Sequence, residues 1–288
     1  MKGIILAGGT GSRLFPLTLV TSKQLLPVHN KPMIYYPLTT LMQAGIKDIL
    51  IISTPNDIPR FQSLLGNGSN FGIKLSYAIQ ERPEGLAQAF LIGEDFIGDS
   101  ACALILGDNI FCGDGLYQHL RNASKRCEEG LSTLFGYEVD DPTRFGVIEL
   151  DKNNNAISIE EKPKHPKSNY CVTGLYFYPN DVVSKAKTIK PSERNELEIT
   201  SLNNLYLQEK RVRVELLDNN YKWLDTGTLE SLSDATNFIK KAEKTTGKFI
   251  GCPEETAFQN GWIDKEKLTE EATKMLASEY GQHLKKLI

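Results

Sequence analysis

The chain has 288 residues, which is enough for one large core or for two unequal domains. Its net charge of −3 and its pI near 5.9 provide no basic field, so we expect neither a nucleic-acid partner nor a membrane partner. Five cysteines without a Cys-x-x-Cys pair are typical of a reducing compartment, and four scattered histidines indicate neither a zinc site nor a His-based nucleophile. With no signal peptide and no apolar run of membrane-spanning length, we expect a cytoplasmic protein.

The first thirty residues hold the most distinctive pattern of the chain. A short apolar run ends in Gly8-Gly9-Thr10-Gly11, and the cations Arg13 and Lys23 follow. The apolar run is typical of a buried strand, and the glycines leave backbone N–H groups free to approach an anion, so we predict a phosphate-binding loop. A Walker loop needs a Lys directly after the glycines, and a dinucleotide fingerprint needs a glycine in place of Leu14, so neither is favoured. A tight turn that binds nothing is the alternative, although a turn rarely needs three glycines and two cations.

Strand-like and helix-like patterns alternate along the next hundred residues. Apolar residues at helical spacing predict a helix over 32–45, and a continuous apolar run predicts a buried strand over 48–53. Further strands are predicted over 74–79 and, buried, over 101–106. A further helix is predicted over 86–96. Right-handed crossovers bring the carboxyl ends of such strands to one edge of a parallel sheet, where open α/β sheets bind ligands.

From about residue 130 the pattern changes to shorter strands joined by polar turns. Strands are predicted over 146–150, 156–160 and 169–178, with a hairpin turn at 151–155. A helix over 198–208, a strand over 212–217 and a helix over 229–246 follow. The last residues, from 251, contain two helix-like stretches, and we expect them to form an appendage to the main domain.

Two aspartates stand beside these predicted elements. Asp108 follows the strand at 101–106, and Asp225 precedes the helix at 229. Mg²⁺ prefers one or two carboxylates together with substrate phosphates and waters, so the two residues suffice for a site. Taken alone, an aspartate at a strand end is more typical of a turn or a helix cap, and Glu161-Lys162 taken alone is typical of a solvated turn.

Taken together, these segments resemble the nucleotidyltransferase family of sugar-nucleotide pyrophosphorylases. The resemblance is carried by Gly8 to Pro16, by Lys23, by Gly107-Asp108-Asn109 and by Trp223 to Gly227. It extends from residue 3 to about residue 263, and the segments 22–27, 31–37, 196–200 and 251–262 are similar to the thymidylyl branch of the family. The chain departs from the family at His29-Asn30 and at Gln259, which lies where the family binds a regulatory nucleotide.

The resemblance implies a fold and a division of the chain. The fold would be α/β, a Rossmann-like, open, mixed and mostly parallel sheet flanked by helices, with a β-rich sugar-binding insertion and a small helical C-terminal appendage. Residues 1–250 would be the catalytic domain, with a nucleotide-binding part at about 1–130 and a sugar-phosphate-binding part at about 131–228. Residues 251–288 would serve assembly or regulation, since the family is commonly a homotetramer.

The resemblance also implies roles for individual residues. Arg13, Lys23, Asp108 and Lys162 would act in catalysis, and Asp108 and Asp225 would hold Mg²⁺. The residues implied to bind the nucleotide are Leu6, Gly8, Gly9, Thr10, Gly11, Ser12, Arg13, Gln24, Gln80, Pro83 and Gly85. Those implied to bind the sugar phosphate are Asn109, Gly146, Glu161, Lys162, Val172, Tyr176, Arg194 and Trp223. A surface loop that caps a helix is the alternative for the segment around Gln80 and Gly85.

The implied reaction is transfer of a thymidylyl group from dTTP to glucose 1-phosphate, giving dTDP-glucose and pyrophosphate. It is the first step of dTDP-sugar biosynthesis, for example of dTDP-rhamnose. Two alternatives remain: the same chemistry with UTP or another sugar 1-phosphate, and a non-catalytic sugar-nucleotide sensor. The cations Arg13 and Lys23 and the two aspartates argue against the sensor, because binding a product does not require every group that neutralises a leaving pyrophosphate.

Overall fold

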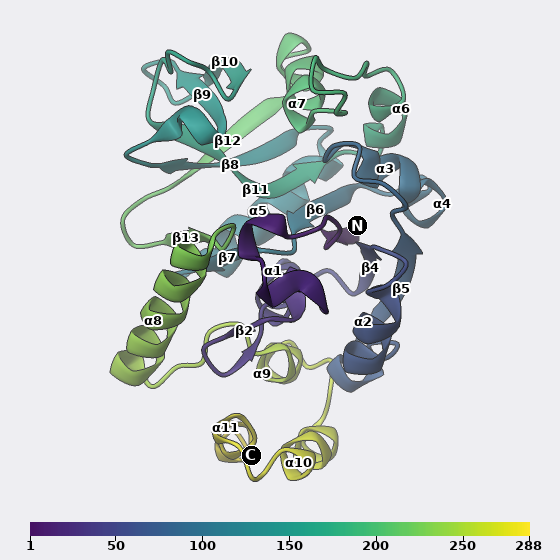
Figure 1. Cartoon of the computed structure of the whole chain (residues 1–288), viewed down its shortest axis with the longest axis vertical. Helices are drawn as coiled ribbons and strands as arrows, with labels where there is room; N and C mark the ends of the chain where they lie inside the picture. The colour runs from purple at the N-terminus through teal and green to yellow at the C-terminus, as the bar shows by residue number, and fades with distance from the viewer.

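A nine-stranded mixed sheet forms the centre of the computed structural model, which describes residues 1–288 (Figure 1). Its order is β10-β9-β11-β6-β1-β4-β5, and β8 joins β11 to β12. The parallel half consists of β1 (Lys2–Leu6), β4 (Asp48–Ser53), β5 (Lys74–Ile79) and β6 (Cys102–Leu106). The mostly antiparallel half consists of β8 (Ser132–Glu138), β9 (Gly146–Leu150), β10 (Ala156–Glu161), β11 (Tyr170–Tyr178) and β12 (Val212–Leu217). The expected open, mixed α/β sheet is confirmed.

Continuous apolar runs form the three inner parallel strands β1, β4 and β6 because both faces of the sheet are covered there, whereas the edge strand β5 is partly polar and partly exposed. Neighbouring side chains of β1 enter different clusters, with Ile5 in one buried core and Ile4 in the other. The helices of this half are α1 (Tyr35–Gln43), α2 (Ile58–Leu65), α3 (Gln88–Ile92), α4 (Glu94–Ile97) and α5 (Leu116–Glu128). No helix in the structure is both long and apolar enough to cross a membrane.

The predicted helix over 86–96 is wrong as a single element. The structure has two short helices there, α3 and α4, which meet at Gly93. At this point the chain lies so close to β1 that a Cβ on Gly93 would be 3.0 Å from the side chain of Ile4. The close approach requires a glycine at position 93, and glycine is a weak helix former, so the helix breaks at this residue.

Two small sheets and three helices complete the part of the chain before residue 251. β7 (Asn109–Cys112) pairs with β13 (Lys222–Asp225), and β2 (Pro27–Val28) pairs with β3 (Lys31–Pro32). The helices are α6 (Val182–Ala186), α7 (Ile199–Gln208) and α8 (Leu229–Thr246). Asp225 therefore belongs to a two-stranded sheet beside β6 and not to the main sheet.

The last residues form three helices where two helix-like stretches were predicted. They are α9 (Pro253–Gln259), α10 (Lys265–Lys274) and α11 (Glu279–Lys286). In Figure 1 they lie at the opposite end of the molecule from β9 and β10. Leu268, Tyr280 and Leu284 of these helices are buried in the same apolar cluster as Tyr35 and Phe71, so the appendage and the parallel half share a core.

Candidate active site

A cavity of about 590 Å³ opens beside the carboxyl end of β6, between the parallel half of the sheet and β9 to β11. All eight residues predicted to bind the sugar phosphate line it, as do Arg13, Asp108 and Asp225. The cavity thus brings together side chains from segments that lie as far apart in the sequence as residues 13 and 225. This convergence makes the cavity the candidate active site.

Asp108 lies directly after β6 and is held by two neighbours. The ammonium group of Lys23 donates to Asp108 Oδ2, and both side chains are 14% exposed. The amide of Asn109 donates to Asp108 Oδ1 at 3.1 Å. Asn109 is itself buried, and its side chain is held in place because its Oδ1 accepts from the backbone N–H of Gly174 at 3.0 Å and from the indole N–H of Trp223 at 2.6 Å. Asn109 therefore fixes the position of Asp108.

Asp225 is aligned with Asn109 across the pair of β7 and β13, which places it beside Asp108. The two loops are joined because Thr226 donates to the carbonyl of Asp108 from its hydroxyl at 2.8 Å and from its N–H at 3.2 Å. Burial, and then the charge of Asp108, raise the pKa of Asp225 above its ordinary value. Two carboxylates that lie side by side in a cavity are a donor set that suits a divalent cation.

The polar side of the cavity contains Glu161, Lys162 and Arg194. Glu161 Oε2 accepts from the hydroxyl of Thr200 at 2.5 Å, and its Oε1 lies 3.7 Å from Lys162 Nζ. The guanidinium of Arg194 is 2.8 Å from Glu198 Oε1 and 3.4 Å from Glu161 Oε1. Because carboxylates surround Arg194, a phosphate must compete with them for this cation.

The apolar side of the cavity contains Trp223, Tyr176 and Val172. Trp223 is 8% exposed, and its ring meets that of Phe145 edge to face with the centroids 5.1 Å apart. Tyr176 is 3% exposed and lies in β11. These rings can pack against a sugar, while Gly146 at the start of β9 leaves space beside Glu161.

The glycine loop follows β1 as predicted. Gly9 and Gly11 have φ angles of +93° and +59°, and the carbonyl of Gly11 accepts from the hydroxyl of Thr18 at 2.8 Å. Arg13 points from the loop to the cavity. Most residues predicted to bind the nucleotide lie outside the cavity lining, so their roles stay predictions; they are Leu6, Gly8, Gly9, Thr10, Gly11, Ser12, Gln24, Gln80, Pro83 and Gly85, together with the catalytic candidate Lys23.

The segment after β5 lies against the glycine loop. Gln80 is 4% exposed, and its Oε1 is so close to Gly8 that a Cβ on this glycine would lie 1.9 Å from it. Gly85 packs against the backbone of Leu197, and a Cβ on Gly85 would lie 2.5 Å from the nitrogen of Leu197. Gly85 is therefore required, because its neighbour is backbone, whereas Gly8 meets the end of the Gln80 side chain. The contact between Gly8 and Gln80 places the predicted base-reading segment beside the glycine loop.

Several cavity residues were not predicted. Arg144 lines the cavity, and its charge acts to lower the pKa of Asp225, against the effects of burial and of Asp108. Thr200 holds Glu161, and Glu198 holds Arg194. Arg144 could have been identified from the sequence, because it is a cation directly before the Phe145-Gly146 segment. Thr200 and Glu198 could not, because they act through contacts that only the fold creates.

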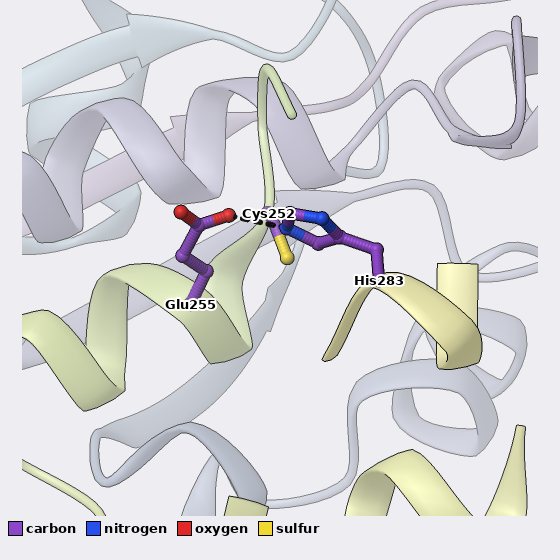
Figure 2. Close-up of side chains that lie close together, drawn as sticks. All are labelled: Cys252, Glu255 and His283. Atoms are coloured by element: carbon purple, nitrogen blue, oxygen red, sulfur yellow. Dashed lines mark hydrogen bonds and ion pairs between the residues drawn. The ribbon is translucent and has the colours of Figure 1, made fainter. Parts of the chain in front are cut away.

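A second polar cluster lies far from this cavity, in the appendage. Figure 2 shows Cys252, Glu255 and His283 pointing toward one another. His283 Nε2 lies 2.7 Å from Glu255 Oε2, which is a hydrogen bond, whereas ligands of one tetrahedral zinc ion lie more than about 3 Å apart. Burial raises the pKa of Cys252 well above its ordinary value, and its sulfur lies 3.2 Å from the hydroxyl of Tyr280. The cluster is therefore a packed contact between α9 and α11.

Comparisons with known proteins identify the family to which the chain belongs. The family described as Nucleotidyl transferase matches residues 2–242. A curated glucose-1-phosphate thymidylyltransferase from Neisseria gonorrhoeae is 54% identical over 288 residues, covering 100% of this chain and 99% of that protein. A crystal structure from Bacillus anthracis, named as a glucose-1-phosphate thymidylyltransferase and containing a sucrose, is 44% identical with a TM-score of 0.76 and covers 83% of this chain and 94% of that one. A UDP-glucose pyrophosphorylase complexed with UDP-glucose is 26% identical with a TM-score of 0.72, over 84% of this chain and 98% of that one. The chain belongs to the nucleotidyl transferase family.

Proposed function

We propose that this protein transfers a thymidylyl group from dTTP to glucose 1-phosphate, giving dTDP-glucose and pyrophosphate. A curated relative that is 54% identical over the whole chain is named for this activity. The observation that carries the proposal is the single cavity in which Asp108 and Asp225 lie with the cations Arg13, Lys162 and Arg194. The reaction would supply dTDP-sugar biosynthesis, for example that of dTDP-rhamnose.

The sugar phosphate would bind between β9 and β11. Glu161 is suited to accept hydrogen bonds from sugar hydroxyls, with Thr200 holding one of its oxygens at 2.5 Å. Lys162 offers a positive charge to the phosphate beside it. Arg194 is 41% exposed and can turn from its carboxylate partners to the same phosphate. Trp223 would lie against the sugar ring.

The triphosphate would bind from the side of the glycine loop. The loop amides and Arg13 would hold the departing pyrophosphate, and Lys23 would contact the triphosphate. The attacking oxygen belongs to a sugar phosphate that is already ionised at neutral pH, so no general base is needed for in-line attack on the α-phosphorus. Catalysis then depends on positioning and on neutralisation of charge.

Members of the family generally use a divalent metal, and we propose Mg²⁺ held by Asp108 and Asp225. The fit rests on two converging carboxylates, of which Asp225 has a raised pKa because it is buried beside Asp108. When bound, the ion supplies positive charge to the phosphate oxygens. Lys23, which is paired with Asp108 in the structure, is then free to contact the triphosphate.

The base would be read by Gln80 and the N–H of Gly85. Thymine offers an N3–H donor between two carbonyl acceptors, and an amide side chain can meet this edge. Uracil offers the same edge, and a structural neighbour at 26% identity is named as a UDP-glucose pyrophosphorylase. UTP is therefore the second candidate donor, because only a methyl group and the ribose 2′-hydroxyl separate it from dTTP.

The proposed division of the chain into parts follows from the residues proposed to bind the nucleotide and the sugar phosphate. We propose that residues 1–250 are the catalytic domain, with the nucleotide-binding part at about 1–130 and the sugar-phosphate-binding part at about 131–228. Residues 251–288 would serve assembly into a homotetramer or regulation. The acidic charge and the cysteine usage favour the cytoplasm as the place of action.

A panel of nucleoside triphosphates against several sugar 1-phosphates, with Mg²⁺ present and pyrophosphate release as the readout, tests the proposal. We expect the highest kcat/KM for dTTP with glucose 1-phosphate. A higher kcat/KM with UTP or with another sugar would select the related activity. Tight binding of dTDP-glucose without any pyrophosphate release would show that the protein is a sensor.

A further inference from the structure

Gln88, the first residue of α3, makes three hydrogen bonds that the proposed reaction does not require. Its Oε1 accepts from the backbone N–H of Glu84 at 3.1 Å and from Nε2 of Gln80 at 2.7 Å. Its Nε2 donates to Oε2 of Glu84 at 2.9 Å. The side chain of Gln88 thus links the end of the loop at residue 84 to the residue proposed to read the base.

The partners of Gln88 fix the direction of its amide. A backbone N–H can only donate, and a carboxylate can only accept, so the two contacts with Glu84 determine which end of the Gln88 amide is oxygen and which is nitrogen. Gln80 must then present its NH₂ to the oxygen of Gln88. The opposite orientation of Gln80 would place two carbonyl oxygens against each other and remove the 2.7 Å hydrogen bond.

The carbonyl of Gln80 is consequently turned toward the glycine loop. A Cβ on Gly8 would lie 1.9 Å from Oε1 of Gln80, so this oxygen sits directly against the loop. The oxygen has no hydrogen-bond donor from the protein, and Nε2 retains one hydrogen beyond the one given to Gln88. Gln80 therefore offers one acceptor and one donor in a fixed order.

We propose that Gln88 is a positioning residue that sets base selectivity by fixing the amide orientation of Gln80; this inference rests on the proposed function. An acceptor and a donor in fixed order match the N3–H and a carbonyl of thymine or uracil. Cytosine needs the reverse order at its N3 and N4 positions, which an amide can supply only after it turns over. Gln88 prevents this rotation, so its loss admits cytosine without removing any group that contacts the phosphates.

The test compares kcat/KM for dTTP and dCTP, with glucose 1-phosphate saturating, in three variants of the full chain. Gln88→Met keeps the length and the helix propensity of the side chain but removes the acceptor, so the dTTP-to-dCTP ratio should fall by about tenfold, the range of one buried hydrogen bond. Gln88→Glu combined with Glu84→Gln is the matched control, because the carboxylate still accepts from Gln80 and from the N–H of residue 84, while an amide at position 84 can donate to its second oxygen in place of the bond that Gln88 gives to Glu84. This double variant should keep the ratio within about twofold. Gln88→Lys replaces the acceptor by a donor and should lower the ratio at least as far as Gln88→Met.

A general structural role would lower both rates together and leave the ratio unchanged. A ratio that stays at the unmodified value in Gln88→Met and in Gln88→Lys overturns the assignment, as does an equal loss in the control that combines Gln88→Glu with Glu84→Gln. If Gln88→Met does not fold, Gln88→Lys decides alone, since its charge can pair with Glu84. If the unmodified protein turns over dTTP and the variants keep its dTTP-to-dCTP ratio, only the role of Gln88 is refuted. If the unmodified protein does not turn over dTTP, the proposed function is refuted as well.

Discussion

At the scale of single residues, the pair Asp108 and Asp225 supports the sharpest expectation. Each carboxylate lines the cavity, and neither can take the place of the other because Asp108 lies between β6 and β7 whereas Asp225 is the last residue of β13. We expect Asp108→Asn and Asp225→Asn each to lower kcat by roughly 100-fold or more, because both remove charge from the same proposed ion site. Steady-state pyrophosphate release at saturating Mg²⁺ measures the effect.

Asp114→Asn is the matched control for this pair. Asp114 makes an ion pair with Lys248 at 2.9 Å, but its side chain is 91% exposed, so the same chemical change should leave kcat within error. Near-normal turnover of Asp108→Asn or Asp225→Asn at saturating Mg²⁺ would contradict the shared ion site.

Glu161 and Lys162 are adjacent, yet we expect their replacements to fail in different ways. Glu161→Gln should reduce the discrimination between glucose 1-phosphate and its epimers, because Glu161 is proposed to meet the sugar hydroxyls. Lys162→Ala should slow every sugar phosphate alike, because it is proposed to meet only the common phosphate. A panel of sugar 1-phosphates gives kcat/KM for both variants, and identical profiles across that panel would remove the division of roles.

At the scale of helices, the contact between α9 and α11 contains a carboxyl that is almost completely buried. Glu254 of α9 is 2% exposed and accepts a hydrogen bond from the hydroxyl of Tyr280 in α11. Burial raises the pKa of this carboxyl from its ordinary value of 4.5 to about 6. The two helices are therefore joined by a group whose charge changes with pH in a mildly acidic range.

This raised pKa predicts a pH dependence of stability. Between pH 4.5 and pH 6 the folded protein retains a proton that the unfolded chain has lost, so the free energy of unfolding should fall as the pH rises. The contribution is about 2 kcal/mol across this window and is constant above it. Glu254→Gln cannot titrate but keeps an acceptor for Tyr280, and it should lack this fall. Urea unfolding of both proteins at several pH values tests this, and parallel curves would show that Glu254 titrates normally.

At the scale of the whole molecule, the C-terminal helices are part of the main core. Leu268, Tyr280 and Leu284 are buried in one cluster with Tyr35 of α1. Deletion of residues 265–288 therefore removes these three side chains and uncovers the apolar surface of α1 that they cover. Three large buried side chains correspond to roughly 5–9 kcal/mol, which is comparable to the whole stability of an ordinary domain. We expect the truncated chain to lose its cooperative unfolding transition.

Circular dichroism during urea unfolding measures this prediction. Leu268→Ala provides a graded comparison, because one buried leucine should cost about 2–5 kcal/mol and leave a cooperative transition at lower urea. A truncated chain with the same midpoint as the full chain would show that the appendage is energetically separate from the catalytic part.

The sequence by itself determined the elements whose pattern is local. The strands at 48–53, 74–79 and 212–217 were predicted with the bounds that the structure has. The run at 48–53 is the clearest of them, because a strand covered on both faces is apolar over its length. The helix at 229–246 was also predicted with its observed bounds, and its lysine-rich end suits the helix dipole. The sequence also identified the segments that meet in the cavity, but through the resemblance of several motifs to a known family, since Asp108, Asp225 and Glu161-Lys162 taken alone are more typical of turns and caps.

Only the tertiary structure decided what those side chains contact. The pairing of Lys23 with Asp108, the carboxylates around Arg194 and the orientation of Gln80 by Gln88 each depend on where the loops between the elements lie, and helix or strand periodicity does not encode this. The helix break at Gly93 and the inclusion of the last helices in the main core likewise arise from close packing against β1 and α1. Local pattern specifies which residues are buried, whereas the partners they find are set by long-range packing, and in this protein those partners position the proposed catalytic groups.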